Sequence, residues 1–81
     1  MPQNRIKLIW DFHGPDAEKI AQHHVIHLNE FAAHKQLNQS LTGVESIAEM
    51  HFIAFLVVDQ DKMIAVRDAL KPHRGQHYKE D

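Results

Sequence analysis

The segment from Phe52 to Val58 is apolar at every position, and it constrains the fold of this chain more than any other feature. A strand with one solvated face alternates apolar and polar residues, whereas a strand buried on both faces is apolar throughout. The segment is far shorter than the roughly 20 apolar residues that a membrane-spanning helix requires. We therefore expect a central strand of a sheet that is covered on both sides, and no membrane partner.

Two further strands are expected beside this one. Residues Arg5 to His13 alternate, which predicts a strand with one apolar and one mostly polar face. An unbroken strand from Val44 to Val58 would exceed the usual strand length, so we expect two strands joined near Ala48 to His51. The first of them, Val44 to Ala48, alternates like a flanking strand. The apolar face of the Arg5–His13 strand carries Ile6, Leu8, Trp10 and Phe12.

Two helices complete the expected elements. A turn at residues 14–16 precedes a helix that persists to about Leu37. After a polar connector at 38–40 and a turn signal at Thr42-Gly43, the second helix follows a cap at 59–61 and stops at Pro72. The tail from His73 either returns as a short edge strand or lies loose. The apolar arc of the first helix contains Ala17, Ile20, Ala21, His24, Leu28, Phe31 and Ala32.

The element order strand, helix, strand, strand, helix and a last strand predicts one α+β domain over residues 1–81, with 73–81 as an edge strand or flexible tail. Two helices on one face of a small antiparallel sheet bury every apolar face in this order. The chain resembles ferredoxin-like domains and the small dimeric α+β barrel proteins. Two features carry the resemblance: the order of the elements, and the segment FIAFLVVDQDKMIAVRDAL, which is similar to the third strand and second helix of many such domains. The resemblance implies a homodimer with facing sheets. The strand around Phe55, which is apolar on both faces, agrees with facing sheets. The charged residues Arg5 and Lys7 on the outer face of the first strand do not agree with them.

Composition excludes several classes of function. The chain has 81 residues, with nine Lys plus Arg against eleven Asp plus Glu, and its basic residues are scattered, so we expect no nucleic-acid partner. It contains no cysteine, so a metal would need His, carboxylate or water ligands. Three isolated glycines give no nucleotide-binding motif, so no nucleotide cofactor is expected. The N-terminal sequence lacks a signal peptide pattern, which predicts a cytoplasmic protein. A core this small favours a homodimer.

A histidine stripe on the first helix is the first candidate site. His23, His27, Glu30 and His34 recur at i, i+4, i+7 and i+11, so they share one face of a helix. Histidines at i and i+4 can place two imidazole nitrogens on one divalent metal such as zinc or nickel, with the glutamate as a third ligand. The alternative is a histidine-rich, solvated helix edge. His24 lies within the apolar arc and is expected to be a packed core histidine.

The second candidate site lies on the sheet face away from the helices. If Trp10 points at the helices, Asp11 and His13 point away, and the flanking strand could add Glu49 and His51 on the same side. A carboxylate beside an imidazole orients it and raises its basicity, as a general base or a metal ligand requires. His13 or His51 would then be the base and Asp11 or Glu49 its orienter. The alternative is a polar rim.

These observations lead to a small cytoplasmic dimeric protein that binds a divalent metal or small ligand through histidine and carboxylate groups. An alternative is a cofactor-independent enzyme, similar to the oxygenases and isomerases among dimeric α+β barrels, with a histidine general base. A further alternative is a structural protein whose histidines make its association depend on pH.

Overall fold

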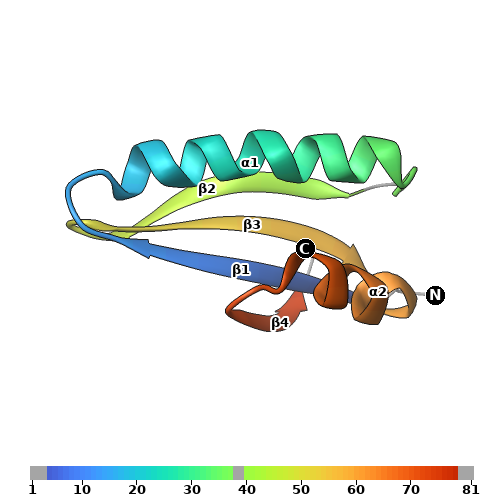
Figure 1. Cartoon of the computed structure of the whole chain (residues 1–81). Coiled ribbons are helices and arrows are strands. Elements are labelled where there is room, and N and C mark those ends of the chain that lie inside the picture. The colour runs from blue at the N-terminus through green and yellow to red at the C-terminus, as the bar shows by residue number, and fades with distance from the viewer. Residues whose placement is uncertain (1–3, 38–39, 79–81) are drawn as a thin grey trace.

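The computed structural model describes residues 4–37 and 40–78 (Figure 1). The strands form one antiparallel sheet in the order β2-β3-β1-β4, which confirms the ferredoxin-like layout expected from the sequence. Along the chain the elements are β1 (Arg5–His13), α1 (Ala17–His34), β2 (Leu41–Ala48), β3 (His51–Asp59), α2 (Gln60–Leu70) and β4 (Arg74–Tyr78).

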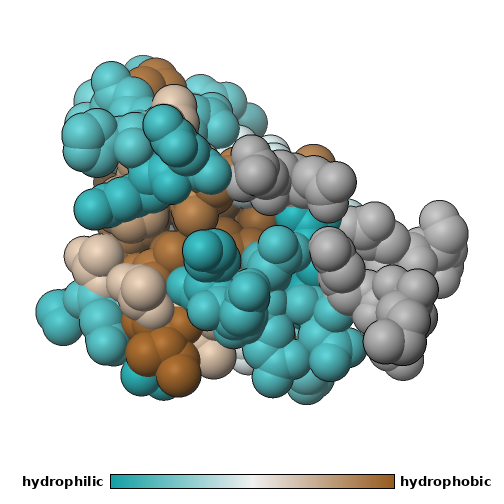
Figure 2. All heavy atoms as spheres, turned by 90° about the vertical axis from the view of Figure 1, so that its right-hand side faces the viewer, coloured by the Kyte–Doolittle hydropathy of each residue, from teal (hydrophilic) through white to brown (hydrophobic). Residues whose placement is uncertain are grey.

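Both helices contribute to one apolar core on the same face of the sheet. Figure 2 shows hydrophobic residues in the middle of the molecule, beneath a helix whose outer surface is largely hydrophilic. The two central strands are also buried on the other face, which we call the open face, because Ile9, Ile53 and Val57 are each no more than 2 % exposed. The core consists of Ile6, Leu8, Trp10, Ala21, Leu28, Ala54, Leu56, Val58 and Val66.

Helix α1 ends at His34, three residues before the position expected from its apolar pattern. Gln36 adopts a positive φ of 56°, so the backbone leaves the helix there. The amide of Leu37 donates to the carbonyl of Ala32 at 2.9 Å, and that of Gln36 donates to Ala33 at 3.2 Å. This pair of bonds is a Schellman motif, which satisfies carbonyls of the last turn and so stops the helix even though the apolar pattern continues.

Strand β2 begins at Leu41, so Thr42 and Gly43 are strand residues and not the expected turn. Gly43 lies opposite Phe55 of β3, and a Cβ at Gly43 would come within 2.7 Å of the Phe55 ring. The glycine is therefore required by close packing of an aromatic ring on the open face. The Lys7 ammonium lies 4.4 Å from the centre of the same ring and forms an ion pair with Glu45. Charged side chains of the chain itself thus cover part of this face.

The division of residues 44–58 into two strands is confirmed, with the turn at Glu49 and Met50. The C-terminal segment also forms an edge strand, β4, which resolves the two alternatives for residues 74–78. Lys71 ends α2 in a left-handed conformation with a φ of 51°, and Pro72 follows it. The amide of His73 then donates to the carbonyl of Ile9 at 2.9 Å, which brings the chain back to β1.

Leu28→Ala tests the contribution of α1 to the core. Leu28 is fully buried, so we expect the substitution to lower the free energy of unfolding by about 2–5 kcal/mol. Ile26→Ala is the matched control, because Ile26 lies on the same helix but is 56 % exposed, and we expect a change within about 0.5 kcal/mol. Urea denaturation followed by circular dichroism measures both values. Equal losses in the two variants would contradict the packing described above.

Candidate functional site

The β1–β3 pairing brings three of the residues predicted for the open face together. His13 lies directly opposite His51 in the antiparallel register, and Asp11 lies opposite Ile53. Residues two apart on a strand share a face, so Asp11, His13 and His51 are neighbours. The end of this pairing is held by Gly14, whose amide donates to the carbonyl of Met50 at 2.8 Å.

A hydrogen bond joins Asp11 to His51. The Oδ1 atom of Asp11 lies 2.9 Å from Nε2 of His51, and the two side chains are only 18 % and 23 % exposed. Because an ionised carboxylate can only accept, Nε2 of His51 carries the donated proton. In the neutral imidazole, Nδ1 then holds a lone pair that can accept a proton or bind a metal. The pairing therefore fixes both the orientation and the tautomer of His51.

Arg74 of β4 approaches the same carboxylate from the other side. Its Nε donates to Oδ2 of Asp11 at 2.9 Å, and its Nη2 donates to Oδ1 at 3.0 Å. This two-point contact holds the pKa of the Asp11 carboxyl well below its usual range, and the His51 bond adds to the effect against the opposing influence of burial. Asp11 in turn raises the pKa of Arg74. Sequence reasoning missed Arg74, because nothing in the local pattern reveals that β4 pairs with β1.

His13 and Glu49, the other two residues predicted for this candidate site, differ in whether they lie next to His51. The His13 ring stacks on that of His51, with 4.1 Å between ring centres and 19° between ring planes. Glu49 is exposed in the β2–β3 turn, and the carboxylate that binds His51 comes from Asp11. We call Asp11, His13, His51 and Arg74 the Asp11 cluster. It combines an oriented imidazole with a second imidazole at the surface of the sheet.

The helix stripe is brought together only in part. The Nε2 atoms of His23 and His27 are 3.1 Å apart, and Nδ1 of His27 lies 3.3 Å from Oε1 of Glu30. His34 lies in the last turn of α1, about 10 Å along the axis from His27 at 1.5 Å per residue. Within residues 4–37 and 40–78, no three His, Asp or Glu side chains lie together in an arrangement that could hold a metal ion.

His24 packs among aromatic rings beside the core. Its ring centre lies 4.9 Å from that of Trp10 and 5.6 Å from that of Phe12. Burial lowers the pKa of His24, and the nearby His27 and His73 add to this effect. The residue is thus a packed histidine, as its place in the apolar arc indicates.

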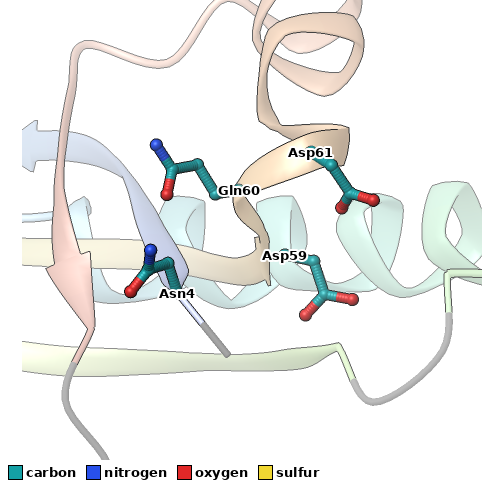
Figure 3. A pocket seen from close by; sticks show the side chains of 4 residues that line it. All are labelled: Asn4, Asp59, Gln60 and Asp61. Carbon is teal, nitrogen blue, oxygen red and sulfur yellow. The ribbon is translucent and has the colours of Figure 1, made fainter. Parts of the chain in front are cut away.

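A hollow at the start of α2 is lined by polar side chains (Figure 3). Its lining consists of Asn4, Asp59, Gln60 and Asp61. The Asp59 carboxylate pairs with Arg5 at 3.6 Å, and the Asp61 side chain extends away from Asn4 and Gln60. Nothing in this hollow points to a particular ligand, so the histidine sites remain the stronger candidates.

Comparisons with protein-family models, with curated proteins and with solved structures found no significant match to this chain. Neither of the two helices in the described part of the chain is long and apolar enough to cross a membrane.

Asp11→Asn tests whether the Asp11 cluster stabilises the sheet through the charged carboxylate. At pH 7 we expect the free energy of unfolding to fall by about 1.5–3 kcal/mol, as for hydrogen bonds to a charged group. Because the Asp11 pKa is lower in the folded than in the unfolded chain, this contribution is complete above the unfolded value of about 3.9. It is lost progressively as the pH falls below that value, so the difference between wild type and variant should shrink in acid.

Denaturation curves at pH 7 and at pH 2.5 measure this difference. Asp68→Asn is the matched control, because the Asp68 side chain is 67 % exposed and forms an ion pair with its neighbour Arg67 on the surface of α2. We expect Asp68→Asn to change stability by less than about 0.5 kcal/mol at either pH. A deficit of Asp11→Asn that is equal at the two pH values would rule out the ionic contribution.

Proposed function

We propose that this protein binds a divalent transition-metal ion, zinc or nickel, through His23 and His27 of α1. The separation of 3.1 Å between their Nε2 atoms supports this proposal. Two imidazole nitrogens that bind one tetrahedral zinc ion at about 2.0–2.1 Å lie roughly 3.4 Å apart. The two side chains therefore need only a small adjustment to accept a metal ion between them.

Glu30 supports the same site through His27. Its carboxylate lies 3.3 Å from Nδ1 of His27, close enough to accept the Nδ1 proton once a metal binds through Nε2. A carboxylate in this position orients a metal-binding imidazole and raises its basicity. Glu30 thus acts in the proposed site as a partner of His27, and the remaining coordination positions would be filled by water or by side chains of a second copy.

A homodimer is part of this proposal. The large apolar side chains of Ile47 and Met50 are 48 % and 52 % exposed at the end of the β2–β3 hairpin, where a second copy could cover them. Ile20 of α1 is also 46 % exposed, and it lines a shallow depression with Lys19, His23, His24 and His27. Covering Ile20 would therefore bring a second copy close to the proposed metal ligands.

The proposal predicts saturable binding of Zn²⁺ and Ni²⁺ by the metal-stripped protein at neutral pH. Isothermal titration calorimetry should show that His23→Ala/His27→Ala abolishes binding, whereas His34→Ala retains it. A stoichiometry of one ion per chain indicates ligands from one copy, and one ion per two chains indicates a site shared across the homodimer. Binding should weaken in acid, because protonated imidazoles do not bind metal. Unchanged affinity in the double variant would exclude the site.

The Asp11–His51 hydrogen bond favours a second candidate function, general-base catalysis by a small enzyme that needs no cofactor. In this proposal Nδ1 of His51 accepts a proton from an organic substrate, and Asp11 stabilises the resulting imidazolium. The exposed His13 ring forms one wall for the substrate. Carbon acids are the substrate class that such a base would serve.

The carbon acid 5-nitrobenzisoxazole is a suitable probe for this base, because its ring opens when a single proton is removed. We expect the protein to accelerate ring opening above an equal concentration of free imidazole, and His51→Gln to remove most of that acceleration. Asp11→Asn should lower the rate as well, since a correctly oriented base contributes substantially to proton transfer. His77→Gln, which removes an exposed histidine of β4, is the control. Equal rates for wild type and His51→Gln would exclude this function.

A further inference from the structure

A groove of about 410 Å³ runs between α2 and β4 on the helix side of the sheet. We infer that this groove binds a small organic anion with an apolar body, such as a short- to medium-chain carboxylate. The volume falls within the range of about 300–1,000 Å³ that is typical of small-molecule sites. The groove lies apart from the proposed metal ligands of α1.

The floor of the groove is apolar. Ile6 and Leu8 of β1 lie at its base, and Met63 of α2 lines its side. Gly75 of β4 lies opposite Leu8 in the sheet, and a Cβ there would point at the floor, 3.4 Å from Leu8 and 3.7 Å from Ile6. The missing side chain at Gly75 therefore leaves room for the apolar part of a ligand.

The side chains around the groove favour an anionic ligand, because the lining includes an arginine and two histidines. Arg67, His73 and His77 line it, and the described lining contains no carboxylate. Arg67 pairs with Asp68 at 3.3 Å, but both side chains are more than half exposed, and such a pair is worth little. Arg67 can therefore turn toward a bound carboxylate and form a charge-assisted hydrogen bond. A cationic ligand would meet only positive or neutral side chains.

The turn that closes the groove is held in place before any ligand binds. Nδ1 of His73 accepts a hydrogen bond from the backbone amide of Asp11 at 2.8 Å. Because Nδ1 is the acceptor, a neutral His73 carries its proton on Nε2, which remains a donor. The His73 amide also donates to Ile9, so both bonds fix the start of β4 against β1. A preorganised site loses less entropy when a ligand binds.

Titration with sodium octanoate, followed by the amide resonances of the ¹⁵N-labelled protein in the presence of a chelator, tests the inference. We expect saturable shifts that include Gly75 and His77. Octanol should bind at least about tenfold more weakly, because it lacks the charge, and octylammonium should not bind at the groove. If all three probes bind alike, the groove is an unselective apolar surface and the inference is wrong.

Two variants locate the site. Gly75→Val should abolish octanoate binding, because its side chain occupies the floor, while the ordinary contact distances at Gly75 and the preference of valine for strands preserve the fold. Arg67→Gln should weaken binding about tenfold, whereas Lys62→Gln, which removes one charge from exposed α2 outside the groove, should leave it unchanged. Retained binding in a folded Gly75→Val protein would overturn the inference. Dissociation of a homodimer by Gly75→Val, with no octanoate binding to wild type, would assign the groove to a second copy instead.

Discussion

The antiparallel pairing of β1 with β3 is the interaction on which the rest of this structure depends. These two strands occupy the centre of the sheet, and both are buried on the helix face and on much of the open face. Their register places His13 opposite His51, and Asp11 two residue pairs further along, on the same face as His51. The same β1 residues that fill the core, Ile6 and Leu8, also form the floor of the groove beside α2. One pairing therefore supports both the Asp11 cluster and the groove.

Asp11 connects three strands through a single side chain and its amide. The carboxylate accepts from His51 of β3 and from Arg74 of β4, and the Asp11 amide donates to the His73 ring. Arg74 thus bonds on the open face, while its neighbour Gly75 opens the groove on the opposite face. Because successive strand residues point to opposite faces, a movement of β4 changes both places at once. Strand β4 therefore contributes neighbouring residues to both the Asp11 cluster and the groove.

The histidine pair of α1 has a simpler origin. Helical geometry alone places residues four apart on one face, so His23 and His27 meet without any help from the sheet. His34 has the right spacing for the same stripe, but it lies about two helical turns from His27, too far to share one ion. The spacing of residues in the sequence shows which of them share a face of the helix. It does not show whether they are close enough along the helix axis to bind the same ion.

The sequence by itself determined the elements and their faces. The apolar run at 52–58 predicted the central strand, the alternation at Arg5–His13 predicted β1, and the shared face of Asp11 and His13 followed from the strand period. Only the tertiary structure decided which strands pair and in what register, since pairing depends on the packing of residues far apart in the chain. It brought Arg74 to Asp11, selected Asp11 and not Glu49 as the carboxylate that bonds to His51, and extended β2 to Leu41, so that Gly43 lies against the Phe55 ring. The alternation of apolar and polar residues within one segment indicates which of its side chains are buried. The Asp11 cluster is assembled from three strands, and it depends on contacts between segments that are far apart in the sequence.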